Sequence, residues 1–174
     1  MDEIIKAGLK DFLERLGMSE EPMGLYYSDQ KPESGFSPKP GNLPTSAMEA
    51  KGEINWGEVF GNFSCVMGNL WRARKKGTAA FFDRDRFGCL GGAFYLGFLK
   101  PQLEFITYYV STGIPNQIQG EHYLESAEVT RHFFQTIDPR PAPARYCVFK
   151  PISQFGIDEQ PELITFFARG EILC

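Results

Sequence analysis

Apolar residues recur every three or four positions at the start of the chain, which is the period of an amphipathic helix. At about 100° per residue, the apolar residues of segment 2–17 fall within an arc of roughly 100°. They are Ile5, Leu9, Phe12, Leu13 and Leu16. We therefore predict an amphipathic helix that ends at Gly17, since glycine readily adopts the left-handed conformation that closes a helix.

A second helical period begins near Ser64, whose hydroxyl is suited to cap a helix N-terminus. One face of this helix carries Val66, Leu70 and Ala73. The helix is predicted to end in a basic turn, residues 74–76, followed by Gly77. Such a turn complements the helix dipole, and contact with a phosphate-bearing ligand is the alternative.

Short apolar runs bounded by Gly, Pro or Asp predict strands at 22–28, 78–82, 144–150 and 163–168. Residues 121–136 have a helical period, and residues 103–110 fit a strand or a helix equally well. This succession of elements indicates an α+β or α/β fold in which helices cover a mixed β-sheet.

The length of 174 residues and the hydrophobic fraction of 43% suit a single domain, 1–174. Residues 29–44 are rich in Pro, Gly and Ser, so we interpret them as a long loop, either a pocket wall or a plain surface excursion. Residues 170–174 resemble the first turn of an unfinished apolar helix. We therefore expect a chain that is truncated at its C-terminus.

The net charge of -4 and the pI of about 5.3 disfavour an extended nucleic-acid surface, because phosphate binding depends on clustered Lys and Arg. No apolar run approaches the roughly 18 residues of a membrane span, and the first residues lack the pattern of a signal peptide. We expect a cytoplasmic protein without nucleic-acid or membrane partners. Its cysteines then suit thiols, ligands or redox groups better than a disulfide framework. They are Cys65, Cys89, Cys147 and Cys174.

Cys89 stands among glycines at the start of an apolar segment that runs to about Leu99. The nearby glycines are Gly88, Gly91 and Gly92. Glycine lets a ligand or a second backbone approach closely, and a helix N-terminus offers N–H groups to an anion or a thiolate. We predict a binding site here, with Tyr95 in its lining; tight helix packing is the alternative explanation of the glycines.

Cys65 lies at the expected start of the second helix. At about 100° per residue it shares a face with Asn69, Arg72 and Lys76, away from the apolar face. A thiol in such electropositive surroundings is a good nucleophile or ligand, whereas a buried cysteine is an inert apolar residue. Both interpretations of Cys65 stay open.

A metal or iron–sulfur site would use Cys65, Cys89 and Cys147, with Cys174 as a further thiolate, although these cysteines lack the local clustering of such sites. A redox pair of Cys65 and Cys89 is another alternative. An acidic stripe on the predicted 121–136 helix is explained more simply as its solvated side than as a metal site. The stripe consists of Glu121, Glu125, Glu128 and His132.

The segment from Gly88 to Ala93, a Pro22–Leu25 strand, a helix that starts at Cys65 and the sequence Pro161-Glu162-Leu163 occur together. In this respect the chain resembles the DUF169 family of archaea and bacteria. Members of that family continue beyond the point where this chain stops, so the resemblance implies an N-terminal portion. It marks Cys65 and Cys89 as positions that match the family pattern, and it implies no activity.

From these observations we expect a cytoplasmic protein that binds a small molecule or cofactor where the helix starts at Cys65 and Cys89 meet. The helix N-termini would bind a carboxylate or phosphate, and aromatic side chains would form the other walls. A thiol redox role is a further expectation. The expected site residues are Cys65, Cys89, Gly91, Gly92, Asn69, Arg72 and Tyr95. The alternatives are a non-catalytic metal or iron–sulfur module, and a structural or interaction domain whose cysteines only pack. The cofactor, the reaction and the oligomeric state are not identified by the sequence.

Overall fold

The computed structural model describes residues 1–38, 45–55, 65–86, 89–98, 104–116, 118–138 and 140–168. The contacts along the chain divide it into two compact units, each described by itself. The sheet unit comprises Met1–Pro38, Val66–Asp83 and Pro143–Cys174, and the helical unit comprises Lys39–Cys65 and Arg84–Ala142. The described residues form both helices and an antiparallel sheet, so the fold class is α+β, as the sequence predicts.

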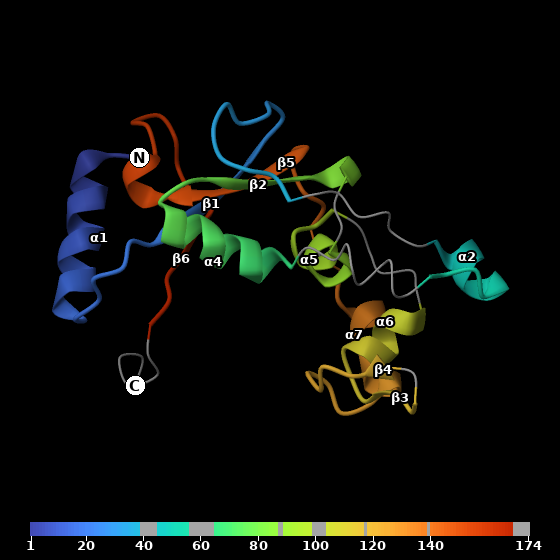
Figure 1. The fold of residues 1–174 in the computed structure, drawn as a ribbon. Coiled ribbons are helices and arrows are strands. Elements are labelled where there is room, and N and C mark those ends of the chain that lie inside the picture. Colours follow the sequence, from blue (N-terminus) through green and yellow to red (C-terminus); the bar gives the residue numbers. More distant parts are fainter. Residues whose placement is uncertain are drawn as a thin grey trace. The chain divides into compact units, whose positions relative to one another are not determined.

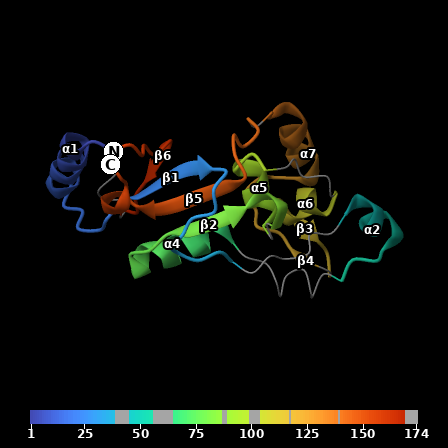
Figure 2. The same cartoon turned by 90° about the horizontal axis from the view of Figure 1, so that it is seen from above.

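A four-stranded antiparallel sheet with the order β2-β5-β1-β6 forms the centre of the sheet unit (Figure 2). Its strands are β1 (Met23–Ser28), β2 (Ala80–Asp83), β5 (Tyr146–Pro151) and β6 (Leu163–Thr165). Each overlaps one of the four apolar runs that predict strands, and β2 and β5 extend one residue beyond theirs. In β5 every residue except Lys150 is buried, which explains why its sequence is almost continuously apolar instead of alternating.

Helix α4 (Val66–Lys76) lies along the sheet and contacts β2 and β5 (Figure 1). Its predicted apolar residues are buried: Val66, Leu70 and Ala73. The described part of the 29–44 loop runs alongside β2, where Phe36 forms a parallel bridge with Ala80. The Phe36 N–H donates to the carbonyl of Ala79 at 3.0 Å. The loop therefore extends the sheet edge over this short distance.

Helix α1 (Glu3–Arg15) confirms the predicted amphipathic helix. The Asp2 carboxylate caps it by accepting a hydrogen bond from the Ile4 N–H at 2.7 Å. An amphipathic helix normally buries its apolar stripe, yet Leu13 is the only buried residue of α1, while Ile5 and Phe12 are 54% and 51% exposed. The helix therefore contacts the rest of the sheet unit through only part of that stripe.

The described residues of the helical unit form short helices and a small hairpin. They are α2 (Ser46–Lys51), the 3-10 turn η1 (Arg84–Arg86), α5 (Leu90–Tyr95), α6 (Glu104–Tyr109), β3 (Gly113–Ile114), β4 (Ile118–Gln119) and α7 (Ala127–Thr136). The ambiguous segment 103–110 thus contains a helix. The prediction of a helix from residue 121 is wrong at its start, because Ser126 caps α7 by accepting a hydrogen bond from the Val129 N–H. The serine cap therefore sets where this helix begins, whereas periodicity alone placed its start earlier in the chain.

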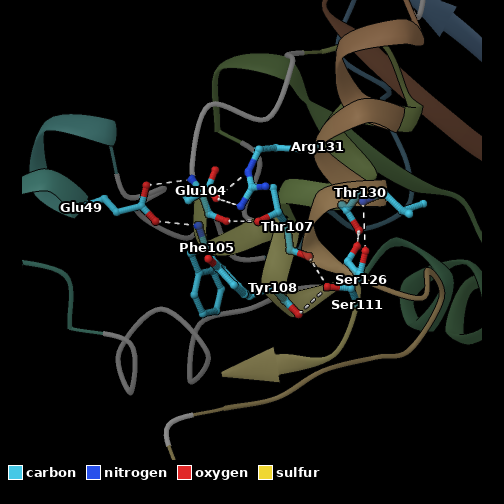
Figure 3. A network of polar contacts seen from close by, with 10 residues as sticks. Glu49, Glu104, Phe105, Thr107, Tyr108, Ser111, Ser126, Thr130 and Arg131 are labelled. Atoms are coloured by element: carbon cyan, nitrogen blue, oxygen red, sulfur yellow. Dashed lines mark hydrogen bonds and ion pairs between the residues drawn. The ribbon is translucent and has the colours of Figure 1, made fainter. Parts of the chain in front are cut away.

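A polar network fastens α2 and α7 to α6 (Figure 3). The Glu49 carboxylate of α2 accepts hydrogen bonds from the Glu104 N–H at 2.9 Å and from the Phe105 N–H at 2.7 Å. Arg131 of α7 donates through Nε to the Glu104 carboxylate at 2.8 Å. Helix α2 has no buried residue of its own. The Glu49 carboxylate therefore attaches α2 by satisfying backbone donors at the start of another helix.

Candidate functional site

Cys89 occupies the position that the sequence predicts, at the start of α5. Its backbone is extended, and its Sγ accepts a hydrogen bond from the Gly92 N–H at 3.3 Å, so its side chain is the helix cap. The side chain is 5% exposed. Of the predicted site residues, Cys89 and Gly92 are therefore brought into direct contact. Since α5 is only six residues long, the field of its dipole is weak.

Tyr109 is a neighbour of Cys89 that sequence reasoning missed. Its hydroxyl donates to the Glu121 carboxylate at 2.9 Å, and its ring stacks on Phe105 with centroids 6.0 Å apart. Burial, the hydrogen bond to Glu121 and the charges of Glu121 and Cys89 together raise the pKa of Tyr109 to about 12, and burial is the largest of these causes. Tyr109 is therefore a protonated hydrogen-bond donor at neutral pH. The 20 positions that separate Cys89 from Tyr109 follow no periodic pattern that could have revealed this proximity.

The glycines around Cys89 have different structural roles. A Cβ atom on Gly91 would have no neighbour within 4 Å among the described residues, so close packing does not explain this glycine. Gly97, beyond the helix, has a φ of +72°, and a Cβ there would lie 2.3 Å from the carbonyl oxygen of Arg140. Tyr95 is 71% exposed and touches Phe94 edge to face. Gly88 lies outside the described residues.

Cys65 directly precedes α4 and is exposed, unlike Cys89. The predicted polar face beside it is divided: Asn69 is buried, with 9% exposure, whereas Arg72 is exposed. The Arg72 guanidinium lies 4.0 Å from the centroid of the Phe36 ring. The predicted cap Ser64 lies outside the described residues. Arg72 therefore stacks on an aromatic side chain.

Cys147 lies in β5 as a fully buried thiol. Burial raises its pKa well above the ordinary value of 9.0, an effect that a hydrogen bond with Tyr27 only partly offsets. Such a thiol stays protonated and inert. Within the described ranges, no three His, Cys, Asp or Glu side chains are grouped so that they could hold a metal ion. Glu121 and Glu125 of the predicted acidic stripe precede α7, which begins at Ala127.

A cavity of about 680 Å³ lies in the sheet unit between α1, the turn that follows it and the 3-10 turn η2 (Ile152–Gln154). Its floor is apolar and is formed by Leu9, Leu13, Met18, Pro22 and Ile152. Its rim carries Lys6, Lys10, Glu14, Gly17, Ser19, Glu20, Glu21 and Ser153. Leu9 and Leu13 of the α1 stripe form one wall of the cavity, whereas the exposed Ile5 and Phe12 do not line it.

The charged groups at the rim are already paired within the protein. Lys6 binds Glu3 at 2.8 Å. The Glu20 carboxylate forms an ion pair with Arg74, and the Glu21 carboxylate accepts a hydrogen bond from the Ser153 N–H at 2.7 Å. The cavity therefore offers apolar contact surface and few charges that a ligand could neutralise.

These features define a small α+β protein with an apolar cavity and a buried cysteine that caps a helix. The chain belongs to the DUF169 family, described as "Uncharacterised ArCR", whose model matches residues 11–173. This confirms the resemblance found in the sequence. Neither the curated proteins nor the solved structures include one that matches the chain. No described helix is long and apolar enough to cross a membrane.

Proposed function

We propose that this protein binds a small, uncharged, largely apolar molecule in the cavity beside α1. The observation that carries the proposal is the cavity itself, whose volume of about 680 Å³ lies within the range of roughly 300–1,000 Å³ that is usual for ligand pockets. We keep the sequence-based expectation that the protein binds a small molecule, but we place the binding site beside α1 and not at the cysteines.

The chemistry of the lining supports an apolar ligand. Leu13, Met18 and Ile152 are at most 7% exposed and are among the apolar residues that line the floor. A ligand that replaces water over such a floor gains about 25 cal/mol for each Å² of apolar surface buried. Because the rim carboxylates of Glu20 and Glu21 are already bound to protein donors, a charged ligand would gain little to compensate for its lost hydration.

Fluorescence titration with N-phenyl-1-naphthylamine, a neutral apolar dye, tests the proposal. Ser19 lies at the exposed rim, so Ser19→Trp places a large ring over the mouth without disturbing the core. Ser34→Trp is the matched control, since Ser34 is also exposed and lies in the same unit but does not line the cavity. We expect about tenfold weaker binding for Ser19→Trp and no change for Ser34→Trp. Absence of binding to the unmodified protein, or equal effects of both substitutions, overturns the proposal.

A redox or nucleophilic role of the thiols is a second candidate, favoured by the hydrogen bond from the Gly92 N–H to the Cys89 sulfur. A donor in this position stabilises a thiolate more than a thiol. The thiol of Cys147 suits a reducing compartment, which supports a cytoplasmic location. Peroxide treatment followed by dimedone labelling tests the redox role: a modified Cys89 supports it, and a Cys89 that stays unmodified in the folded protein refutes it.

A further inference from the structure

The exposed face of α4 combines apolar and basic side chains in two stripes. Residues four positions apart share a helix face, and one stripe consists of Met67, Trp71 and Lys75, with Arg72 and Lys76 on the adjacent stripe. Met67 is 57% exposed and Trp71 is 45% exposed. We call the five side chains together with Phe36 the α4 face.

The cations of the α4 face lie over aromatic rings. The Lys75 ammonium is 3.7 Å from the centroid of the Trp71 ring, and Arg72 and Lys76 are 4.0 and 6.0 Å from that of Phe36. Within the described part of the chain, none of the three cations forms an ion pair. Arg74 in the same helix, by contrast, pairs with Glu20. The α4 face therefore carries positive charge that no acidic side chain among the described residues pairs with.

We propose that the α4 face docks an acidic segment of a partner protein that also carries an apolar side chain. The Arg72 guanidinium lies over the Phe36 ring, and a guanidinium can bind a carboxylate in a bidentate manner. Lys75 and Lys76 supply further charge, and Trp71 and Met67 supply the apolar contact. Tryptophan and arginine are the side chains that most often dominate binding energy at protein interfaces.

The same observations favour a peptide over a nucleic acid or a membrane. Lys75 lies over the Trp71 ring, so this ring face is not free to stack on a base. Three cations within two helical turns match a few carboxylates, whereas the net charge of -4 opposes contact with an extended polyanion. Two exposed apolar side chains, Met67 and Trp71, make a small anchor for a lipid surface.

Fluorescence anisotropy with a short labelled peptide of alternating Glu and Leu residues tests the inference. We expect salt-sensitive binding that weakens about tenfold in the double variant Arg72→Gln/Lys76→Gln. The matched control Lys51→Gln/Arg84→Gln removes two exposed cations of the helical unit and is expected to change nothing. No binding to the unmodified protein, or the same loss in the control, overturns the inference.

Two competing probes separate the other partner classes. An oligo-dT of the same charge represents nucleic acid, and vesicles of phosphatidylglycerol and phosphatidylcholine represent a membrane. Tighter binding of either probe than of the peptide, with the same dependence on Arg72 and Lys76, overturns the assignment to an acidic protein segment. Weaker binding of both supports it.

Discussion

Replacing Gly97 by alanine should destabilise the protein strongly. A residue with a side chain loses about 1–2 kcal/mol in the left-handed conformation that Gly97 adopts at a φ of +72°. The new Cβ would also lie 2.3 Å from the Arg140 oxygen and 2.7 Å from the Ala142 nitrogen, which are backbone atoms that cannot rotate away. Overpacking of this kind costs about 1–3 kcal/mol. The expected loss in the free energy of unfolding is therefore about 2–5 kcal/mol.

Gly91→Ala is the matched control for this substitution. Gly91 lies inside α5 with no neighbour of its would-be Cβ within 4 Å among the described residues. Alanine there should leave stability unchanged or raise it by up to about 1 kcal/mol, because alanine is the better helix former. Urea unfolding followed by circular dichroism measures both variants. Gly97→Ala should lower the urea midpoint by about 1 to 2 M for a typical dependence on urea.

Equal midpoints for the two variants would refute the reasoning, because the structure assigns close packing to Gly97 and open space to Gly91. A strong loss from Gly91→Ala alone would mean that the backbone around Cys89 is packed differently.

In the folded protein, N-ethylmaleimide should label the exposed Cys65 at least tenfold faster than the buried Cys89, as judged by peptide mass spectrometry; equal rates would contradict the burial of Cys89. Burial would raise the pKa of Glu159, but the hydrogen bonds from Lys150 and from the Gly156 N–H, together with the positive charges of Lys150 and the N-terminus, outweigh it and lower that pKa. The resulting stabilisation is complete above the unfolded value of 4.5 and is lost as the pH falls through the lower folded pKa, so Glu159→Gln should flatten the acid side of a stability profile from urea unfolding. A profile identical to that of the unmodified protein would refute this. Glu49→Gln leaves one carbonyl oxygen where two carboxylate oxygens now accept from the start of α6, so hydrogen exchange of these two amides should become faster by about tenfold; unchanged exchange would show that other contacts hold α2.

Local sequence patterns were sufficient to predict most of the sheet unit. The strands β1 and β5 follow from apolar runs, because both pack within the sheet and need apolar side chains on most positions. Helices α1 and α4 follow from periodicity and from glycine stops at Gly17 and Gly77, whose φ values are +66° and +57°. Such signals depend on neighbouring residues alone, which is why a single sequence reveals them.

The features that the sequence did not predict depend on residues that are far apart in the chain. The cavity needs Leu13 of α1 beside Ile152, and no sequence pattern links these positions. Sequence periodicity likewise gives no indication that Cys89 lies near Tyr109, or that the Glu49 carboxylate accepts hydrogen bonds from the start of α6. Cys89 itself could be placed at a helix start, because glycines mark the turn, but its burial depends on packing that the sequence does not state.

Methionine methyl NMR tests the proposed binding cavity most directly. Met18 is 7% exposed and lies in the cavity wall, whereas Met48 and Met67 are 37% and 57% exposed and lie outside it. In protein labelled with [ε-¹³C]methionine and titrated with N-phenyl-1-naphthylamine, the Met18 signal should shift with saturation while those of Met48 and Met67 stay in place. A Met18 signal that does not respond, or shifts of all three without saturation, would contradict a ligand cavity beside α1.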